Sequence, residues 1–144
     1  MKSAEFFTPE TQAEIVKAIK HAEAQTSGEI RLFVEDHCKD DVLDRAAFMF
    51  EKLKMHETEL RNGVLFYLAF LDHKFAIIGD VGINAKVEEH FWNDIKEKMA
   101  EHFAKKEFTE GLSKGLIQAG EALGKHFPRQ TSDKNELSDH VELG

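Results

Sequence analysis

The sequence predicts an α/β fold: a small mixed sheet, made of a β-α-β unit and an antiparallel hairpin, with about four helices around it. Two apolar runs, 64–70 and 75–78, flank a short polar turn, which is typical of a hairpin. An alternating strand over 29–35 precedes a helical pattern over 41–54, and a crossover of that length favours a right-handed parallel pairing with the next strand. At 144 residues, the chain suits one domain with a single core.

Capping residues and apolar spacing place the helices. Thr8–Glu10 opens the first helix, which runs to about Gln25, because threonine caps, proline suits the first turn and glutamate favours the N-terminal dipole. The second helix spans about 41–54, Asn84 is predicted to cap the third, and Thr109 to begin the fourth. The inner faces of the last two helices carry apolar residues three or four positions apart: Val87, Phe91, Ile95, Met99 and Phe103, then Leu112, Leu116, Ala119 and Leu123.

Composition narrows the classes of function. Residues 1–127 are predicted to form the domain, and the polar residues 128–144 a mobile tail or a short docking strap. A formal net charge of -8 predicts no nucleic-acid partner, because an acidic chain repels phosphate backbones. The start of the chain lacks the apolar core of a signal peptide, and no run of about 18 apolar residues could span a membrane, so a cytoplasmic location is expected. Whether the chain binds a partner protein is a question that the composition leaves open.

Topology predicts that three glycine-containing segments meet at one edge of the sheet. Two parallel strands begin at the same edge, and the second strand of the hairpin ends there. The segments at that edge are Thr26–Glu29, Arg61–Gly63 and Gly79–Gly82. Their glycines are expected to allow positive φ angles or close approach of the backbone.

The polar residues of these segments are the candidate functional residues. The oxygen atoms of Glu29, Asn62 and Asp80 suit a hard cation such as Ca²⁺ or Mg²⁺. Alternatively, Arg61 pairs with Asp80 and no metal is needed. No pair of nucleophile and base is evident, so catalytic residues are not predicted. The candidate ligand-binding residues are Glu29, Arg61, Asn62, Gly63, Gly79, Asp80 and Gly82.

A rival site is predicted at the opposite edge. Ligands of α/β sheets bind outside the carboxyl ends of parallel strands, which points to Glu35, Asp36 and Asp72. The acidic loop that follows Asp36 lacks the glycine and the glutamate of an EF-hand, so its acids are expected to cap the second helix. Cys38, the only cysteine, is expected as a surface-loop thiol that is either reactive or a bystander.

Gly111 and Gly115 lie one turn apart in the fourth helix, where glycine costs roughly 1 kcal/mol relative to alanine. Either close helix packing or the approach of a ligand would explain them.

Together these motifs resemble the TPM domain family, over about Thr8 to Phe127. The segments that carry the resemblance are Thr26-Ser27-Gly28-Glu29-Ile30, Asn62-Gly63-Val64-Leu65, Gly79-Asp80-Val81-Gly82-Ile83, Glu110-Gly111-Leu112 and Gly115-Leu116. The resemblance implies a three-layer α/β/α sandwich. A plant thylakoid member is linked to photosystem repair and acid phosphatase activity, and calcium is associated with an acidic pocket of the family. Many members have an acidic residue directly before Asn-Gly, where this chain has Arg61.

Two hypotheses of function follow. The first is a binding or accessory module that uses the glycine motifs as its ligand surface. The alternative is an acid-phosphatase-like hydrolase, in which Glu29, Asn62 and Asp80 hold a divalent cation and Arg61 binds the phosphate. Whether the chain is an enzyme therefore stays open at the level of the sequence.

Overall fold

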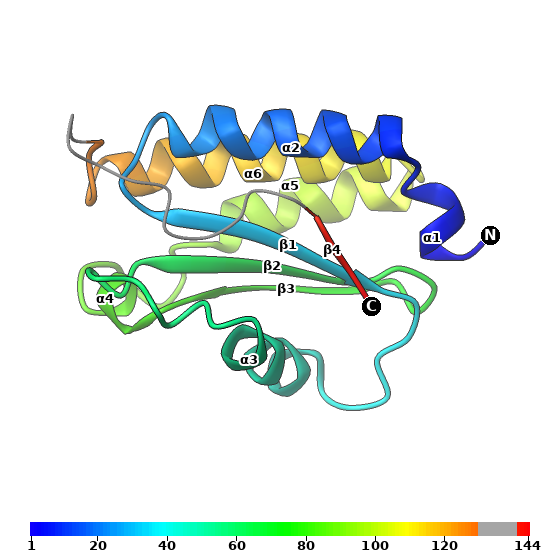
Figure 1. Cartoon of the computed structure of the whole chain (residues 1–144), viewed down its shortest axis with the longest axis horizontal. Coiled ribbons are helices and arrows are strands. Elements are labelled where there is room, and N and C mark those ends of the chain that lie inside the picture. The colour runs from blue at the N-terminus through cyan, green and yellow to red at the C-terminus, as the bar shows by residue number, and fades with distance from the viewer. Residues whose placement is uncertain (130–140) are drawn as a thin grey trace.

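The computed structural model describes residues 1–129 and 141–144, and it confirms the predicted α/β fold. The helices of this described part are α1 (Ser3–Phe6), α2 (Pro9–Glu23), α3 (Val42–Lys52), α4 (Val81–Asn84), α5 (Asn93–Ala104) and α6 (Phe108–Gly124). The sheet lies between two helical layers, with α3 on one face and α2, α5 and α6 on the other (Figure 1). This arrangement is the three-layer sandwich that the resemblance implied.

The sheet is mixed, and its strand order is β3-β2-β1-β4. The strands are β1 (Glu29–Glu35), β2 (Gly63–Ala69), β3 (Lys74–Gly79) and β4 (Glu142–Leu143). β1 runs parallel to β2 and β4, whereas β2 and β3 form the antiparallel hairpin. Glu29 lies opposite Gly63, and Val64 lies opposite Gly79, so the start of β1, the start of β2 and the end of β3 share one edge.

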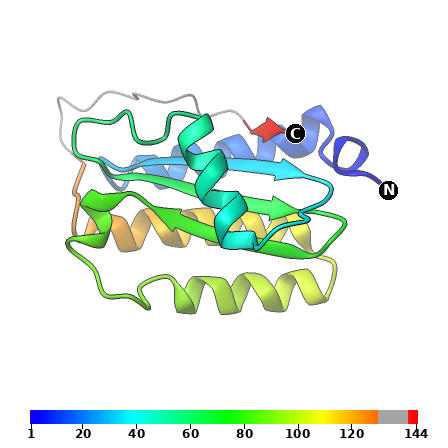
Figure 2. The ribbon, with the colours of Figure 1, turned by 90° about the horizontal axis from the view of Figure 1, so that it is seen from below.

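Side-chain alternation along the strands builds an apolar layer on each face of the sheet. Ile30, Leu32 and Val34 of β1 join the larger core under α2, α5 and α6. Phe33 faces the opposite way and packs with Tyr67 in the smaller core under α3. Figure 2 shows α3 crossing the strands on that face. Because both faces of the sheet are covered, β1 and β2 are buried along nearly their whole length.

Two predicted helix starts are confirmed by their caps. Thr8 Oγ1 accepts a hydrogen bond from Thr11 N at 3.2 Å, and Pro9 is the first residue of α2. Asp41 accepts a hydrogen bond from Leu43 N at 3.2 Å and caps α3, as expected for the acidic loop. The start of α6 at Phe108 lies one residue before the predicted Thr109.

The predicted start of the third helix is wrong. Asp80 caps the short helix α4, which ends at Asn84, and the long helix α5 begins only at Asn93. Val87 and Phe91 lie in the connection, yet both pack against the core as their spacing suggested. The Phe91 and Trp92 rings pack edge to face, and their centroids are 4.7 Å apart. An irregular connection brings these adjacent side chains to the core, whereas neighbours in a helix point about 100° apart.

The predicted tail falls partly outside the described residues, which omit 130–140. At the end of the chain, Val141 is buried, and Glu142 and Leu143 pair with Phe33 and Val34 of β1. These last residues therefore add a short parallel strand to the sheet. Within the described residues, no helix is both long enough and apolar enough to cross a membrane.

Close helix packing explains the two glycines at the α5–α6 contact. A Cβ atom at Gly111 would lie 2.9 Å from His102 Cβ, and one at Gly115 would lie 2.6 Å from Met99 Sδ. A larger residue at Gly111 would therefore press on α5, and one at Gly115 would require the Met99 side chain to move. Of the two explanations offered for these glycines, the structure supports packing.

Candidate functional site

The three glycine segments meet at one edge of the sheet, as the topology predicted. Glu29 N donates to Asn62 O at 3.4 Å, which joins the first segment to the second. The second and third segments are joined by Asp80 N donating to Gly63 O at 3.0 Å and by Gly82 N donating to Arg61 O at 2.9 Å. We refer to Thr26–Glu29, Arg61–Gly63 and Gly79–Gly82 together as the glycine rim.

The glycines of the rim serve close packing rather than unusual backbone angles. None of the described glycines has a positive φ. A Cβ atom at Gly63 would lie 2.6 Å from Met55 O, and one at Gly82 would overlap Leu60 O and lie 2.6 Å from Arg61 O. These positions have no room for a side chain, so the rim depends on glycine for its shape.

An ion pair between Arg61 and Asp80 dominates the chemistry of the rim. Arg61 Nε donates to Asp80 Oδ2 at 2.7 Å, and Nη2 donates to Oδ1 at 2.9 Å. The Asp80 side chain is 4% exposed and the Arg61 side chain is 46% exposed. Hydrogen bonding to Asp80 raises the pKa of Arg61 further, so the guanidinium keeps its charge. The sequence left open whether Asp80 binds a cation or pairs with Arg61, and the structure contains the pair with Arg61.

The same pair holds two structural elements in place. Asp80 Oδ1 also accepts a hydrogen bond from Val81 N at 2.7 Å, which caps α4. Arg61 itself has a φ of 49°, a left-handed conformation that is uncommon for a residue with a side chain. The pair therefore ties a strained turn before β2 to the first turn of α4.

The other predicted oxygen ligands, Glu29 and Asn62, are buried within the glycine rim. Asn62 is 2% exposed, and its Nδ2 donates to Ser27 Oγ at 3.4 Å, while its backbone N donates to Thr58 Oγ1 at 3.2 Å. Glu29 is 3% exposed and lies opposite Gly63 in the sheet. Both residues thus help to fasten the segments to each other.

This arrangement does not fit a divalent cation on Asp80 while Arg61 stays in place. Both carboxylate oxygens of Asp80 are already engaged by the Arg61 guanidinium, and one of them also caps α4. A cation would have to compete with a fixed positive charge at hydrogen-bond distance. Glu29, Asn62 and Asp80 could therefore bind a cation together only if Arg61 moved away from Asp80.

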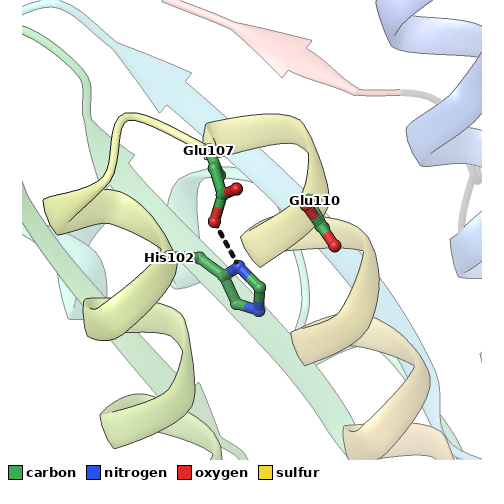
Figure 3. Close-up of side chains that lie close together, drawn as sticks. All are labelled: His102, Glu107 and Glu110. Atoms are coloured by element: carbon green, nitrogen blue, oxygen red, sulfur yellow. Dashed lines mark hydrogen bonds and ion pairs between the residues drawn. The ribbon is translucent and has the colours of Figure 1, made fainter.

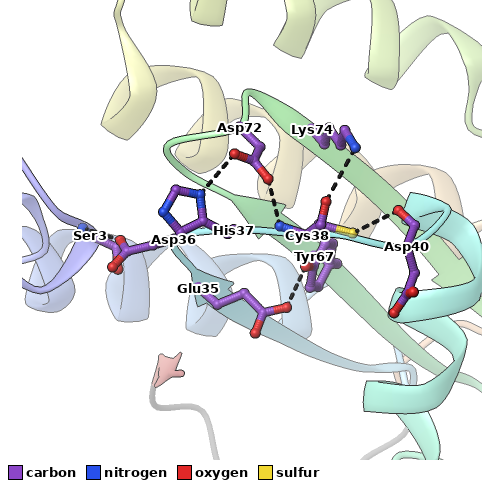
Figure 4. Close-up of polar contacts among 9 residues, drawn as sticks. All are labelled: Ser3, Glu35, Asp36, His37, Cys38, Asp40, Tyr67, Asp72 and Lys74. Carbon is purple, nitrogen blue, oxygen red and sulfur yellow. Dashed lines mark hydrogen bonds and ion pairs between the residues drawn. The ribbon is translucent and has the colours of Figure 1, made fainter.

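The opposite edge of the sheet carries a second charged pair (Figure 4 shows its acceptor, Glu35). Arg45 Nε and Nη2 donate to the two oxygens of Glu35 at 2.8 and 2.9 Å, and the Tyr67 hydroxyl donates to the same carboxylate. Burial favours a higher pKa for Glu35, but the hydrogen bonds from Arg45 and Tyr67 outweigh it and lower the pKa below 4.5. Burial, followed by the hydrogen bond to Glu35, raises the pKa of Tyr67.

The two other carboxylates of the rival site fix loops to each other. Asp72 Oδ1 lies 2.9 Å from His37 Nδ1, and Asp72 Oδ2 accepts a hydrogen bond from Cys38 N at 2.7 Å (Figure 4). Asp36 Oδ1 accepts a hydrogen bond from Ser3 N at 2.7 Å, which attaches α1 to the end of β1. Contacts with His37 and with Ser3 lower the pKa of Asp72 and of Asp36, respectively. Each carboxylate has a structural partner.

The prediction that Cys38 is a surface-loop thiol is wrong. Cys38 is 3% exposed, and its Sγ lies 3.3 Å from Asp40 O. The bond from its backbone N to Asp72 and the bond from Lys74 Nζ to its carbonyl oxygen, at 3.2 Å, turn the loop so that the thiol faces inward. The side chain packs in the smaller core.

Sequence reasoning missed two features that the structure places beside the predicted sites. Leu60, which precedes the rim residue Arg61, and Val81, which lies within the rim, are 52% and 57% exposed. An apolar residue in a glycine turn is the signal that would have drawn attention to them. Arg45 was also missed, because only the packing of α3 on the sheet brings it to Glu35.

Fold and site together define a TPM-type α/β/α sandwich. The family model of the TPM domain matches residues 1–122, so the chain belongs to this family. Among solved structures, the chain is similar to the NMR structure of the BA42 protein from the psychrophilic bacterium Bizionia argentinensis. The TM-score is 0.92 and the identity 43%, and the match covers 99% of each chain. A comparison with curated proteins finds no match.

Proposed function

We propose that this TPM domain is a binding or accessory module and that the glycine rim is the surface that a partner protein contacts. The observation that carries the proposal is the exposed part of the rim. The guanidinium of Arg61, nearly half exposed, adjoins Leu60 in the chain, and Asp80, its acceptor, adjoins Val81. Arginine beside exposed apolar side chains is a combination enriched in protein interfaces.

The rigidity of the rim supports the same proposal. Three segments are joined by backbone hydrogen bonds, and Arg61 is held through two of its nitrogens by a buried carboxylate. A cation fixed in this way loses little conformational freedom when a partner binds, which leaves more of the interaction energy for affinity. Because Asp80 balances the charge of Arg61, apolar contact and hydrogen bonding, rather than net charge, would hold the partner.

Site-specific photo-crosslinking in an extract of the native organism tests the proposal. A photoreactive phenylalanine analogue is placed at Val81 and, as a matched control, at Phe48 of α3, which is 55% exposed. We expect a discrete adduct from position 81 that an excess of the unlabelled wild-type protein suppresses and an excess of Arg61→Ala does not. No adduct specific to position 81, or equal suppression by Arg61→Ala, would overturn the proposal.

The second candidate function is hydrolysis of a phosphomonoester with the help of a divalent cation. Its support is family membership together with the partly exposed guanidinium, which is a common phosphate ligand. In this candidate function, Arg61 would turn from Asp80 to the phosphate. Glu29, Asn62 and Asp80 would then hold the cation. The bound cation would polarise the phosphoryl oxygen.

Cation titration separates the second candidate from the first. Ca²⁺ or Mg²⁺ at millimolar concentration, followed by amide chemical shifts, should move Glu29, Asn62 and Asp80 if the rim holds a cation. Asp80→Asn should then abolish hydrolysis of an aryl phosphate. Absence of shifts at these three residues, or hydrolysis at the wild-type rate by Asp80→Asn, would remove this candidate.

A further inference from the structure

A compact group of metal-type ligands lies at the corner between α5 and α6, far along the chain from the rim. The group consists of His102, Glu107 and Glu110 (Figure 3). One ligand atom from each residue lies within 4.8 Å of the other two. Among the described histidine, cysteine, aspartate and glutamate side chains, this is the group of three that comes together in this way.

The backbone of the corner fixes where these side chains start. Lys106 has a φ of 62°, and Glu107 N donates to His102 O at 2.9 Å, which closes the end of α5. Gly111 lets the first turn of α6 press against α5, because a Cβ atom there would lie 2.9 Å from His102 Cβ. The helix packing and the turn thus place the three residues at one corner of the structure.

Burial and hydrogen bonding orient the imidazole before any ion arrives. The His102 side chain is 23% exposed, and its Nδ1 lies 3.1 Å from Glu107 Oε1. The carboxylates are more exposed, at 42% for Glu107 and 48% for Glu110. A ring held in place beside two carboxylates that can still adjust is a suitable starting geometry for coordination.

We propose that His102, Glu107 and Glu110 form a binding site for a divalent transition-metal ion of the zinc type. One imidazole nitrogen and two carboxylate oxygens are a donor set that zinc accepts, whereas calcium and magnesium prefer oxygen ligands alone. Tetrahedral coordination at about 2.1 Å places ligand atoms about 3.4 Å apart. His102 Nδ1 and Glu107 Oε1 are already 3.1 Å apart, and the other separations, which are at most 4.8 Å, have to shorten by up to about 1.4 Å. Three protein ligands leave a fourth position for water or an anion.

The surroundings decide how firmly the site binds. Lys114 Nζ lies 2.8 Å from Glu110 Oε1, and hydrogen bonding to Lys114 lowers the pKa of Glu110. This exposed pair, four residues apart on one helix, is weak, so an ion can displace the lysine at little cost. A groove of about 240 Å³ between the two helices, lined by His102, Lys98 and Lys114 among others, adjoins the site.

Zinc titration of the full-length chain, followed by calorimetry and by the imidazole ¹⁵N shifts, tests the proposal. We expect one zinc ion per chain and a shift of the His102 ring, with no effect of Ca²⁺ or Mg²⁺ there. His102→Gln should abolish this binding, and Glu107→Gln and Glu110→Gln should each weaken it at least about tenfold. Lys114→Met should strengthen it about twofold, because Glu110 is released.

Two controls keep the result specific to this corner. His90→Gln removes an exposed histidine whose Nε2 lies 3.8 Å from Glu88 Oε2, a pair outside any described group of three ligands, and it should leave zinc affinity unchanged. Thermal melts without metal show whether each variant still folds. Zinc binding that survives His102→Gln in a folded protein, or a His102 ring that does not shift at millimolar zinc, would overturn the proposal.

Discussion

The two edges of the sheet contain the same kind of charged pair in different surroundings. Arg61 and Asp80 at the glycine rim, and Arg45 and Glu35 at the opposite edge, are both bidentate pairs with bonds of 2.7 to 2.9 Å. The guanidinium of Arg61 at the rim is more exposed than that of Arg45, 46% against 30%. At the opposite edge the Tyr67 hydroxyl also bonds the carboxylate.

This difference in exposure indicates which edge of the sheet a partner protein can contact. The rim presents a fixed cation to solvent, whereas the opposite edge uses its pair to hold α3 against the sheet. We therefore expect changes at the rim to alter recognition and changes at Glu35 to alter mainly stability. The following predictions test that contrast, beginning with the largest expected effect.

Replacing Gly82 by alanine should damage the rim most. The added Cβ would overlap Leu60 O and lie 2.6 Å from Arg61 O, so the backbone must move, at a cost of about 3 kcal/mol. Gly28→Ala is the matched control within the rim, because its Cβ would lie 3.3 Å from Asn62 O, and it should cost less than about 1 kcal/mol. Denaturant unfolding measures both. Equal costs would mean that the rim yields more easily than its packing indicates.

Double-mutant cycles should rank the two charged pairs. We expect a coupling energy of about 2 kcal/mol between Arg45 and Glu35 and a smaller one between Arg61 and Asp80, because the more exposed guanidinium regains more solvation when its partner is removed. Alanine variants, singly and together, followed by urea unfolding, give both values. A larger coupling at the rim would reverse the contrast.

Lowering the pH should reduce the free energy of unfolding through protonation of Glu35 at the opposite edge. Its pKa is lowered in the folded chain, so the unfolded chain binds the proton more readily. The contribution of Glu35 is fully present above its unfolded pKa of about 4.5 and is lost as the pH falls through the lower folded value. Glu35→Gln should therefore flatten the fall in unfolding free energy between pH 5 and pH 3. Glu88→Gln, at an 88% exposed side chain, should leave the fall unchanged.

The smallest effect is expected at two of the left-handed residues, His73 and Arg61, which lie near opposite edges of the sheet. His73 in the hairpin turn has a φ of 56°, so His73→Gly should relieve strain and stabilise the chain by about 0.5 kcal/mol. Arg61→Gly relieves similar strain at a φ of 49° but removes the partner of Asp80, so on balance it should destabilise the chain slightly. Thermal unfolding compares the two. Stabilisation by Arg61→Gly would show that the ion pair contributes little.

Much of the fold and part of the site follow from local patterns. The caps at Thr8 and Asp41 were predictable because a side chain bonds its own helix start. The meeting of the rim segments followed from strand direction alone. The third helix was placed wrongly because apolar spacing records which side chains reach the core, and Val87 and Phe91 do so from an irregular connection.

Contacts between distant residues could not be predicted. The burial of Cys38 depends on Asp72, 34 positions away, and the pair of Glu35 with Arg45 depends on how α3 lies on the sheet. Even at the rim, the sequence left Asp80 free to bind either a metal or Arg61.

By itself, the sequence determined the α/β class, the β-α-β unit with its hairpin and the edge at which the glycine motifs meet, because periodicity, capping and strand direction are local properties. Only the tertiary structure decided that Arg61 pairs with Asp80 and that His102, Glu107 and Glu110 share one corner. Those outcomes depend on separations of a few ångströms between segments, which packing sets after the elements have formed.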